Sequence, residues 1–194
     1  MPESFPASIA HRPAVAAALA VAVAGAATIL GAWFFQYGLG LRPCPLCLEQ
    51  RIPYYVAIPL AVIVAIAAAR SAPRSAPRSA PRWLVAGGLA LIVAAMLISV
   101  GLGVYHAGVE WKWWAGPQDC SGPLDPLGSG SLLDKLQGGI NVVRCDEAAW
   151  RFLGLSLAGY NALISLALAA IATWGLAAEA RRSASDSGPA SRHG

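Results

Sequence analysis

Four cysteines are the residues of this chain best suited to chemistry, and they form two pairs of different spacing. Cys44 and Cys47 belong to a Cys-Pro-Leu-Cys motif, whereas Cys120 and Cys145 lie far apart in a second segment. Pairs of the Cys-x-x-Cys type are common in redox-active sites, where a stabilised thiolate attacks another sulfur atom. A structural clip is the alternative, but a disulfide that closes so short a loop adds little stability. We therefore interpret Cys44 and Cys47 as a redox pair.

The second pair leaves more alternatives open. Cys120 lies between Gly116-Pro117 and Ser121-Gly122-Pro123, which predicts an irregular, accessible backbone. Accessible disulfides exchange with other thiols, but a structural disulfide between Cys120 and Cys145 fits the sequence as well. Four cysteines allow three pairings, so the resting pattern stays undetermined at this point.

Two other chemistries of cysteine fit poorly. Zinc sites made of four cysteines usually contain two Cys-x-x-Cys knuckles, and only one is present. Covalent attachment of haem c requires a histidine directly after the second cysteine, where this chain has Leu48. We therefore predict no metal site.

The cysteines are embedded in a chain with the composition of a membrane protein. Hydrophobic residues make up 57% and charged residues only 12%, against about 25% charged residues in soluble domains. Four uncharged runs approach or exceed the roughly 20 residues that cross a bilayer. We predict an all-α membrane protein, a four-helix transmembrane bundle within 14–178, with spans at about 14–37, 52–69, 83–105 and 152–176. The first run is longer than the core of a cleaved signal peptide, so we expect it to be retained.

Charge in the connections predicts the orientation. Segments 1–13, 70–82 and 179–194 carry eight arginines against three acids, whereas 38–51 and 106–151 carry six cations against seven acids. By the positive-inside rule, both termini are expected in the cytoplasm and all four cysteines outside it, where disulfides persist. The net charge of +4 thus reflects topology, and we predict no nucleic-acid partner.

Two connections have recognisable patterns. Residues 71–82 repeat Ser-Ala-Pro-Arg, and the prolines prevent a helix; we expect a flexible basic hairpin without a specific ligand. In the long loop, leucines, isoleucine and valine recur at near-helical spacing over 131–143. This pattern favours a short amphipathic helix on the membrane surface, with a plain loop as the alternative.

Arg51 and His106 are candidate partners of the Cys-x-x-Cys pair. Arg51 follows Cys47 by four residues, and on one helix the two would share a face. Its guanidinium could then stabilise a thiolate or an anionic carrier, aided by the positive N-terminal end of the second span. His106 is expected at the outer end of the third span beside Tyr105. It could be an ordinary interface histidine or part of a carrier pocket.

Taken together, these residues resemble the disulfide-bond formation protein B (DsbB) family of bacterial inner-membrane thiol oxidases. The resemblance covers roughly residues 14–176. The matching elements are the four spans, Cys44-Pro45-Leu46-Cys47 with Gln50-Arg51, Tyr105-His106 leading to Cys120, and Cys145 before Trp150-Arg151-Phe152-Leu153-Gly154.

The resemblance implies a thiol:quinone oxidoreductase with bound ubiquinone or menaquinone and a periplasmic DsbA-like thioredoxin-fold partner. By position, Cys120 would accept the attack of the partner's thiolate, and Cys145 would be its disulfide mate. Electrons would then pass to Cys44 and Cys47, with Cys47 contacting the quinone. Arg51 would stabilise the thiolate–quinone state, and His106 would line the quinone pocket.

Two rival functions remain at this point. One is the same relay serving a dedicated periplasmic partner instead of a general oxidant. The other is a non-catalytic membrane scaffold whose two disulfides are structural.

Overall fold

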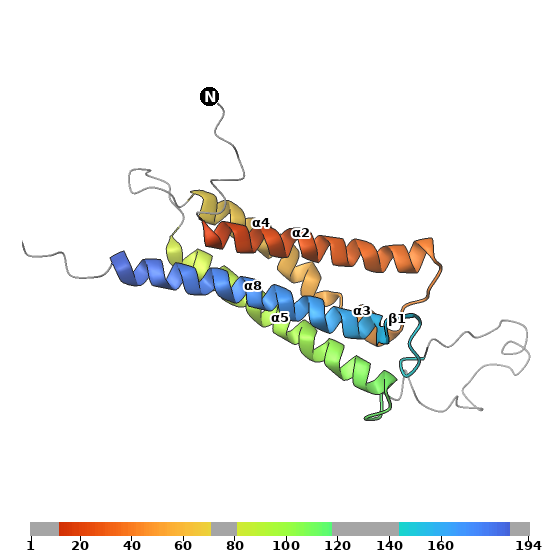
Figure 1. Ribbon diagram of the computed structural model, residues 1–194. Coiled ribbons are helices and arrows are strands. Elements are labelled where there is room, and N and C mark those ends of the chain that lie inside the picture. The colour runs from red at the N-terminus through yellow and green to blue at the C-terminus, as the bar shows by residue number, and fades with distance from the viewer. Residues whose placement is uncertain (1–11, 71–80, 118–143, 187–194) are drawn as a thin grey trace, which may run out of the picture.

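The bundle consists of four long helices that lie side by side (Figure 1). The computed structural model describes residues 12–70, 81–117 and 144–186. The helices are α2 (Pro13–Trp33), α4 (Ile52–Arg70), α5 (Arg82–Glu110) and α8 (Leu157–Asp186). Over these described residues, four helical segments are long and apolar enough to cross a membrane. The predicted all-α, four-helix membrane bundle is therefore confirmed, whereas the predicted amphipathic helix at 131–143 lies outside the described residues.

Each long helix packs against two neighbours. α5 contacts α8 and α4, and α2 contacts α4 and α8. Their shared core is built mostly from alanine and branched aliphatic side chains, among them Ala18, Val21, Ala57, Ala61, Val64, Leu89, Ile92, Met96, Leu168 and Ala172. Lipid provides no hydrophobic drive between helices, so this packing of small side chains is what holds the bundle together.

Glycines allow the closest contacts between helices. A Cβ atom at Gly88 on α5 would lie 2.3 Å from Val64 Cγ2 on α4, and one at Gly175 on α8 would lie 2.6 Å from Ala17 Cβ on α2. Both distances are below 3.0 Å, which is closer than Cβ atoms approach other non-bonded atoms in proteins. A larger residue would therefore push the helices apart.

Short elements connect the long helices at the cysteine end of the bundle. They are the π-helical turn η1 (Phe34–Gly38), helix α3 (Pro45–Glu49) and the antiparallel strands β1 (Arg151–Phe152) and β2 (Leu155–Ser156); α3 and β1 lie at the same end in Figure 1. The sequence predicted a fourth span from residue 152. The helix begins instead at Leu157, because Leu153 and Gly154 both have positive φ, 48° and 83°, and form the tight turn of a hairpin.

α5 also ends later than expected. The sequence predicted a loop from residue 106, but the helix continues to Glu110. It is closed by Lys112 at φ 61° and by Trp113, whose N–H donates to the Gly108 carbonyl at 2.9 Å. His106 and Glu110 are therefore one helical turn apart and face the interior together.

The opposite end of the bundle is held by arginines. Arg12 Nη1 donates to the Ala69 carbonyl at 2.8 Å, and Arg82 forms an ion pair with Glu179 at 3.9 Å. These contacts link the start of α2 to the end of α4, and the start of α5 to the end of α8.

Candidate active site

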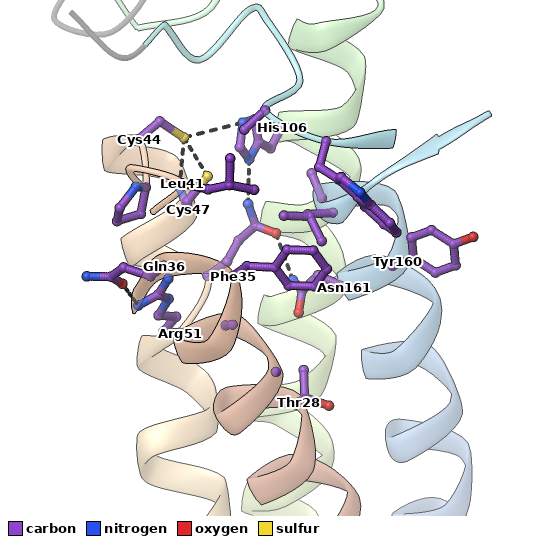
Figure 2. Close-up of a pocket in the computed structure, with 18 of the residues that line it drawn as sticks. Thr28, Phe35, Gln36, Leu41, Cys44, Cys47, Arg51, His106, Tyr160 and Asn161 are labelled. Atoms are coloured by element: carbon purple, nitrogen blue, oxygen red, sulfur yellow. Dashed lines mark hydrogen bonds between the residues drawn. The ribbon is translucent and has the colours of Figure 1, made fainter. Parts of the chain in front are cut away.

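A cavity of about 410 Å³ opens at the cysteine end, between α2, α3, α4, α5 and α8 (Figure 2). Most of its lining is apolar. Of the residues singled out in the sequence, Cys44, Cys47, Arg51 and His106 all line it. The structure thus brings together residues that lie up to 62 positions apart in the chain.

The Cys-Pro-Leu-Cys motif folds into the start of α3. Cys44 is extended (φ −75°, ψ 165°) and caps the helix, and Pro45 occupies its first position, where the absent N–H costs nothing. Cys44 Sγ accepts the Cys47 backbone N–H at 3.2 Å, and the two sulfur atoms are 2.7 Å apart. Both cysteines are free thiols. The sequence had suggested that the motif caps the second span. It instead caps a short helix of its own, α3.

Cys44 is the more enclosed of the two thiols. Only 3% of its surface is exposed, whereas Cys47 is half-buried. Its hydrogen bond with the Cys47 side chain, together with burial, raises the pKa of the Cys44 thiol. The first proton that the pair loses is therefore that of Cys47. The second is that of Cys44, and its removal costs more free energy.

His106 reaches the pair from α5. The residue is 2% exposed, and its Nε2 lies 3.6 Å from Cys44 Sγ (Figure 2). The same nitrogen is 3.8 Å from Glu110 Oε1. His106 is therefore buried in the cavity rather than exposed at the membrane interface, and its role toward a carrier stays a prediction. Glu110 Oε2 is buried and makes no hydrogen bond within the described part of the chain. Glu110 was not among the predicted site residues.

A chain of buried polar groups continues from His106 into the bundle. Gln50 Nε2 lies 2.6 Å from His106 Nδ1, and Asn161 Nδ2 on α8 donates to Gln50 Oε1 at 2.8 Å. From Asn161 the hydrogen bonds continue one after another to Ser99 at 3.3 Å, from Ser99 to Ser165 at 2.9 Å, and from Ser165 to Tyr54 at 2.8 Å. Gln50 belongs to the motif that resembles the family but was predicted no role, and Asn161 was not predicted as a site residue. A polar residue within an apolar span was the available signal for Asn161.

Arg51 lies in the turn between α3 and α4. Its Nη1 donates to Gln36 Oε1 on η1 at 2.7 Å (Figure 2). Its charge also acts on Cys47, opposed by that of Glu110. Arg51 is thus held at the cavity that it lines by Gln36 rather than by a sulfur atom.

Aromatic side chains form the wall opposite the pair. Trp150 stands between Phe35, at 5.0 Å between ring centroids, and Phe152, at 5.8 Å and nearly parallel. Tyr160 lies 6.5 Å from the same ring. A flat, apolar ligand could stack on this wall while its polar atoms face Arg51 and His106.

Cys145 packs near the first pair. It is fully buried and belongs to one cluster with Cys44, Leu46 and Val109, against which Cys47 also packs. Unlike that pair, Cys145 is disulfide-bonded. Cys120, its expected mate, lies outside the described residues.

Ion pairs hold the segment around Cys145 to the end of α5. Asp146 pairs with Arg144, at 2.8 Å, and with Lys112. The Arg144 and Lys112 cations hold the pKa of the Asp146 carboxyl well below its usual range. This carboxylate therefore stays charged throughout the neutral and mildly acidic range.

Comparison with known proteins shows which family the chain resembles. The model of the family "Disulfide bond formation protein DsbB" matches residues 14–175. A disulfide bond formation protein B of Xanthomonas oryzae pv. oryzae is 33% identical over 160 residues, covering 77% of this chain and 82% of its own. That of Xylella fastidiosa (strain Temecula1) is 31% identical, covering 70% and 74%. No solved structure matches the chain significantly.

The family match extends over most of the chain and includes all the residues that line the cavity. It confirms the resemblance that the motifs suggested, and with the four apolar helices it defines a multi-pass membrane protein. The chain therefore belongs to the DsbB family of disulfide bond formation proteins.

Proposed function

We propose that the protein is a quinone-dependent thiol oxidase of the bacterial inner membrane, which reoxidises a periplasmic DsbA-like, thioredoxin-fold protein. The observation that carries the proposal is the position of the Cys44–Cys47 pair. Two free thiols with sulfur atoms 2.7 Å apart line an apolar cavity inside a membrane bundle. A dithiol in that position can deliver electrons to a carrier that is dissolved in lipid.

The cavity suits the head of a ubiquinone or menaquinone. Its volume of about 410 Å³ lies within the usual range of small-ligand sites. The aromatic wall around Trp150 offers a stacking surface, Arg51 supplies a charged donor for a quinone oxygen, and His106 lines the cavity. The quinone supplies a two-electron acceptor, and the chain supplies position, charge and a dry environment.

The proposed reaction balances on the Cys44–Cys47 pair. Both S–H bonds break, one S–S bond forms, and two electrons leave the sulfur atoms. With two protons they convert the quinone into a quinol. Cys47 is the member that we propose to contact the quinone, because it is half-buried and within the field of Arg51. Cys44 then closes the disulfide from its position as helix cap.

The second pair is proposed to face the partner. We assign Cys120 as the sulfur that the partner's thiolate attacks, and Cys145 as its disulfide mate. Cys145 packs in the same buried cluster as Cys44, which supports transfer of the two electrons from this pair to the first by thiol–disulfide exchange.

The proposed orientation has both termini in the cytoplasm and the cysteines in the periplasm. In its support, the arginine contacts of Arg12 and Arg82 lie at the end of the bundle opposite α3, as the positive-inside rule requires of a cytoplasmic end.

The test uses the purified full-length protein with ubiquinone and two reductants, a thioredoxin-fold dithiol protein and a small dithiol. We expect wild type to oxidise both. Cys145→Ser should lose oxidation of the protein substrate and keep quinone reduction by the small dithiol, whereas Cys47→Ser should lose both. Resistance of every cysteine bridge to mild dithiothreitol, with no quinone reduced, would instead support a structural scaffold.

A further inference from the structure

We propose that Gln50 and Asn161 are positioning residues, which hold His106 in the tautomer whose Nε2–H is directed at the Cys44 sulfur. The role rests on the proposed thiol oxidation, because it concerns the charge that Cys44 acquires in that reaction. The hydrogen-bond geometry behind it rests only on the positions of the buried side chains.

A backbone carbonyl determines how the Gln50 amide is turned. Gln50 Nε2 lies 3.2 Å from the Leu46 carbonyl oxygen, which can only accept a hydrogen bond. The nitrogen of the amide must therefore be on this side, and its oxygen on the other. There Oε1 accepts the Asn161 Nδ2–H at 2.8 Å. The Leu46 carbonyl thus determines the orientation of the Gln50 amide, and the contact with Asn161 is consistent with it.

The orientation of Gln50 determines the tautomer of His106. The same Nε2 that faces Leu46 lies 2.6 Å from His106 Nδ1, so its second N–H donates to that ring nitrogen. A neutral imidazole carries one proton, and a ring nitrogen that accepts a hydrogen bond has none. The proton is therefore on Nε2, the nitrogen that lies 3.6 Å from Cys44 Sγ.

Two N–H groups consequently face the Cys44 sulfur. One is the backbone N–H of Cys47 at 3.2 Å, and the other is His106 Nε2–H. Cys44 must lose its proton when the disulfide forms, and the negative charge then arises on a buried atom. Donors that are already in place stabilise that charge without reorganisation. Ionisation of the buried Cys44 thiol is costly, and a histidine held with its Nε2–H toward the sulfur lowers that cost.

The same tautomer bears on metal binding. Cys44, Cys47 and His106 have ligand atoms that all lie within 4.8 Å of one another. A metal would need a lone pair on Nε2, and the Gln50 amide keeps a proton there. The cluster is therefore arranged to donate a hydrogen bond to sulfur rather than to bind a cation.

Other charged groups also act at this site. Glu110 on α5 lies 3.8 Å from His106 Nε2 and competes for its N–H, as does the Cys145 backbone, with which His106 also hydrogen-bonds; Arg151 on β1 acts on Glu110. Arg51 acts on Cys47. These charges can change how much His106 is protonated, but they do not contact Nδ1. A measurement of the neutral tautomer therefore isolates the contribution of Gln50.

The test is nitrogen NMR of the full-length protein labelled with ¹⁵N-histidine. The chain has three histidines, His11, His106 and His193, so His106→Gln assigns the signal. We expect neutral His106 to carry its proton on Nε2 in wild type. Gln50→Met, which keeps the length of the side chain, should give a mixture of tautomers. Asn161→Leu should give a smaller change, because Leu46 still orients the amide, and it serves if Gln50→Met fails to fold.

Kinetics complete the test. Only the molecules that keep the Nε2 proton retain this donor, so Gln50→Met should slow oxidation of the small dithiol a few-fold, in proportion to the fraction that has lost this tautomer. Ser165→Ala is the matched control, because it breaks the same buried chain beyond Ser99 and should change neither tautomer nor rate. A proton on Nδ1 in wild type, an unchanged tautomer in Gln50→Met, or an equal effect of Ser165→Ala would overturn the proposal. Wild type without quinone reduction but with the Nε2–H tautomer would refute the proposed function and leave the tautomer assignment intact.

Discussion

The two halves of the bundle differ in how their interiors are filled. Around Gly88 and Gly175, helices touch through alanine, glycine and valine, and added Cβ atoms would collide with neighbouring side chains. At the cysteine end the same helices diverge around a cavity, and the buried contacts are hydrogen bonds among Gln50, Asn161 and His106. Stability and chemistry are therefore separated along the bundle axis, and substitutions in the two halves should have different effects.

The largest effect is expected at Cys47. Cys47→Ser removes the sulfur that we assign to the quinone, and quinone reduction should fall by on the order of 10³-fold or more, as when other nucleophiles are removed. The packed half is untouched, so the thermal unfolding temperature in detergent should stay within the error of wild type. A stopped-flow assay of quinone reduction measures the first quantity. Loss of folding together with activity would show that the two halves are not separable.

The converse change is in the packed half. Gly88→Val places a Cβ 2.3 Å from Val64 Cγ2, and overpacking of this kind costs about 1–3 kcal/mol. Gly87→Val is the matched control, because a Cβ there meets nothing within 4 Å. Denaturation curves in mixed micelles should show a lower midpoint for Gly88→Val only. Activity per folded molecule should be retained by both, and a specific loss of quinone reduction in Gly88→Val would contradict the separation.

A smaller effect is expected at Arg51, which belongs to the cavity alone. Arg51→Met removes a charge that faces the quinone site, and the KM for quinone should rise about tenfold, equivalent to about 1.4 kcal/mol. Gln36→Leu removes only the 2.7 Å contact that orients Arg51, so its KM should lie between those of wild type and Arg51→Met. An Arg51→Met enzyme with unchanged KM would show that the guanidinium has no part in binding quinone.

The smallest effect concerns Asp146 and has a defined pH dependence. Its pKa is held low by Arg144 and Lys112, so its ion pairs contribute at all pH values above the usual pKa of an aspartate. Their contribution is lost only as the pH falls through the lowered pKa. Asp146→Asn should therefore loosen the Cys145 segment equally at pH 7 and pH 5, and the difference from wild type should vanish only in strong acid.

Reduction of the Cys145 disulfide by a phosphine, which acts across this pH range, measures that loosening. We expect a few-fold faster reduction in Asp146→Asn, since exposed ion pairs contribute little. A difference that disappears already between pH 7 and pH 5 would show that another group controls the segment.

The sequence predicted the bundle well because membrane spans depend on local composition. Uncharged runs are visible without knowledge of the partners of a residue, and the structure confirmed four such helices. The beginning of α8 was harder, because Leu153 and Gly154 form a turn inside an apolar run. Hydropathy does not distinguish a short hairpin from the first turn of a span.

The candidate site was predictable only where a motif was local. Cys44, Cys47 and Arg51 lie within eight residues, so their proximity could be predicted, although Arg51 lies in the turn after α3 and not on one helix with Cys47. Asn161 contacts Gln50 across 111 residues, and no pattern along the chain indicates that contact. Glu110 was not predicted for a related reason, since its burial depends on the unexpected extension of α5 to that residue. A polar residue within an apolar span is itself a signal of a functional site, because burying its side chain in the membrane costs free energy.

The central claim is that the Cys44–Cys47 pair delivers electrons to a quinone in the cavity. A visible absorption scan of the purified protein with ubiquinone tests it most directly, because a thiolate against a quinone gives a charge-transfer band. We predict such a band in Cys44→Ser, where the Cys47 thiolate cannot close a disulfide with its neighbour, and no band in Cys47→Ser. A band that persists without Cys47, or none in either variant, would contradict the account.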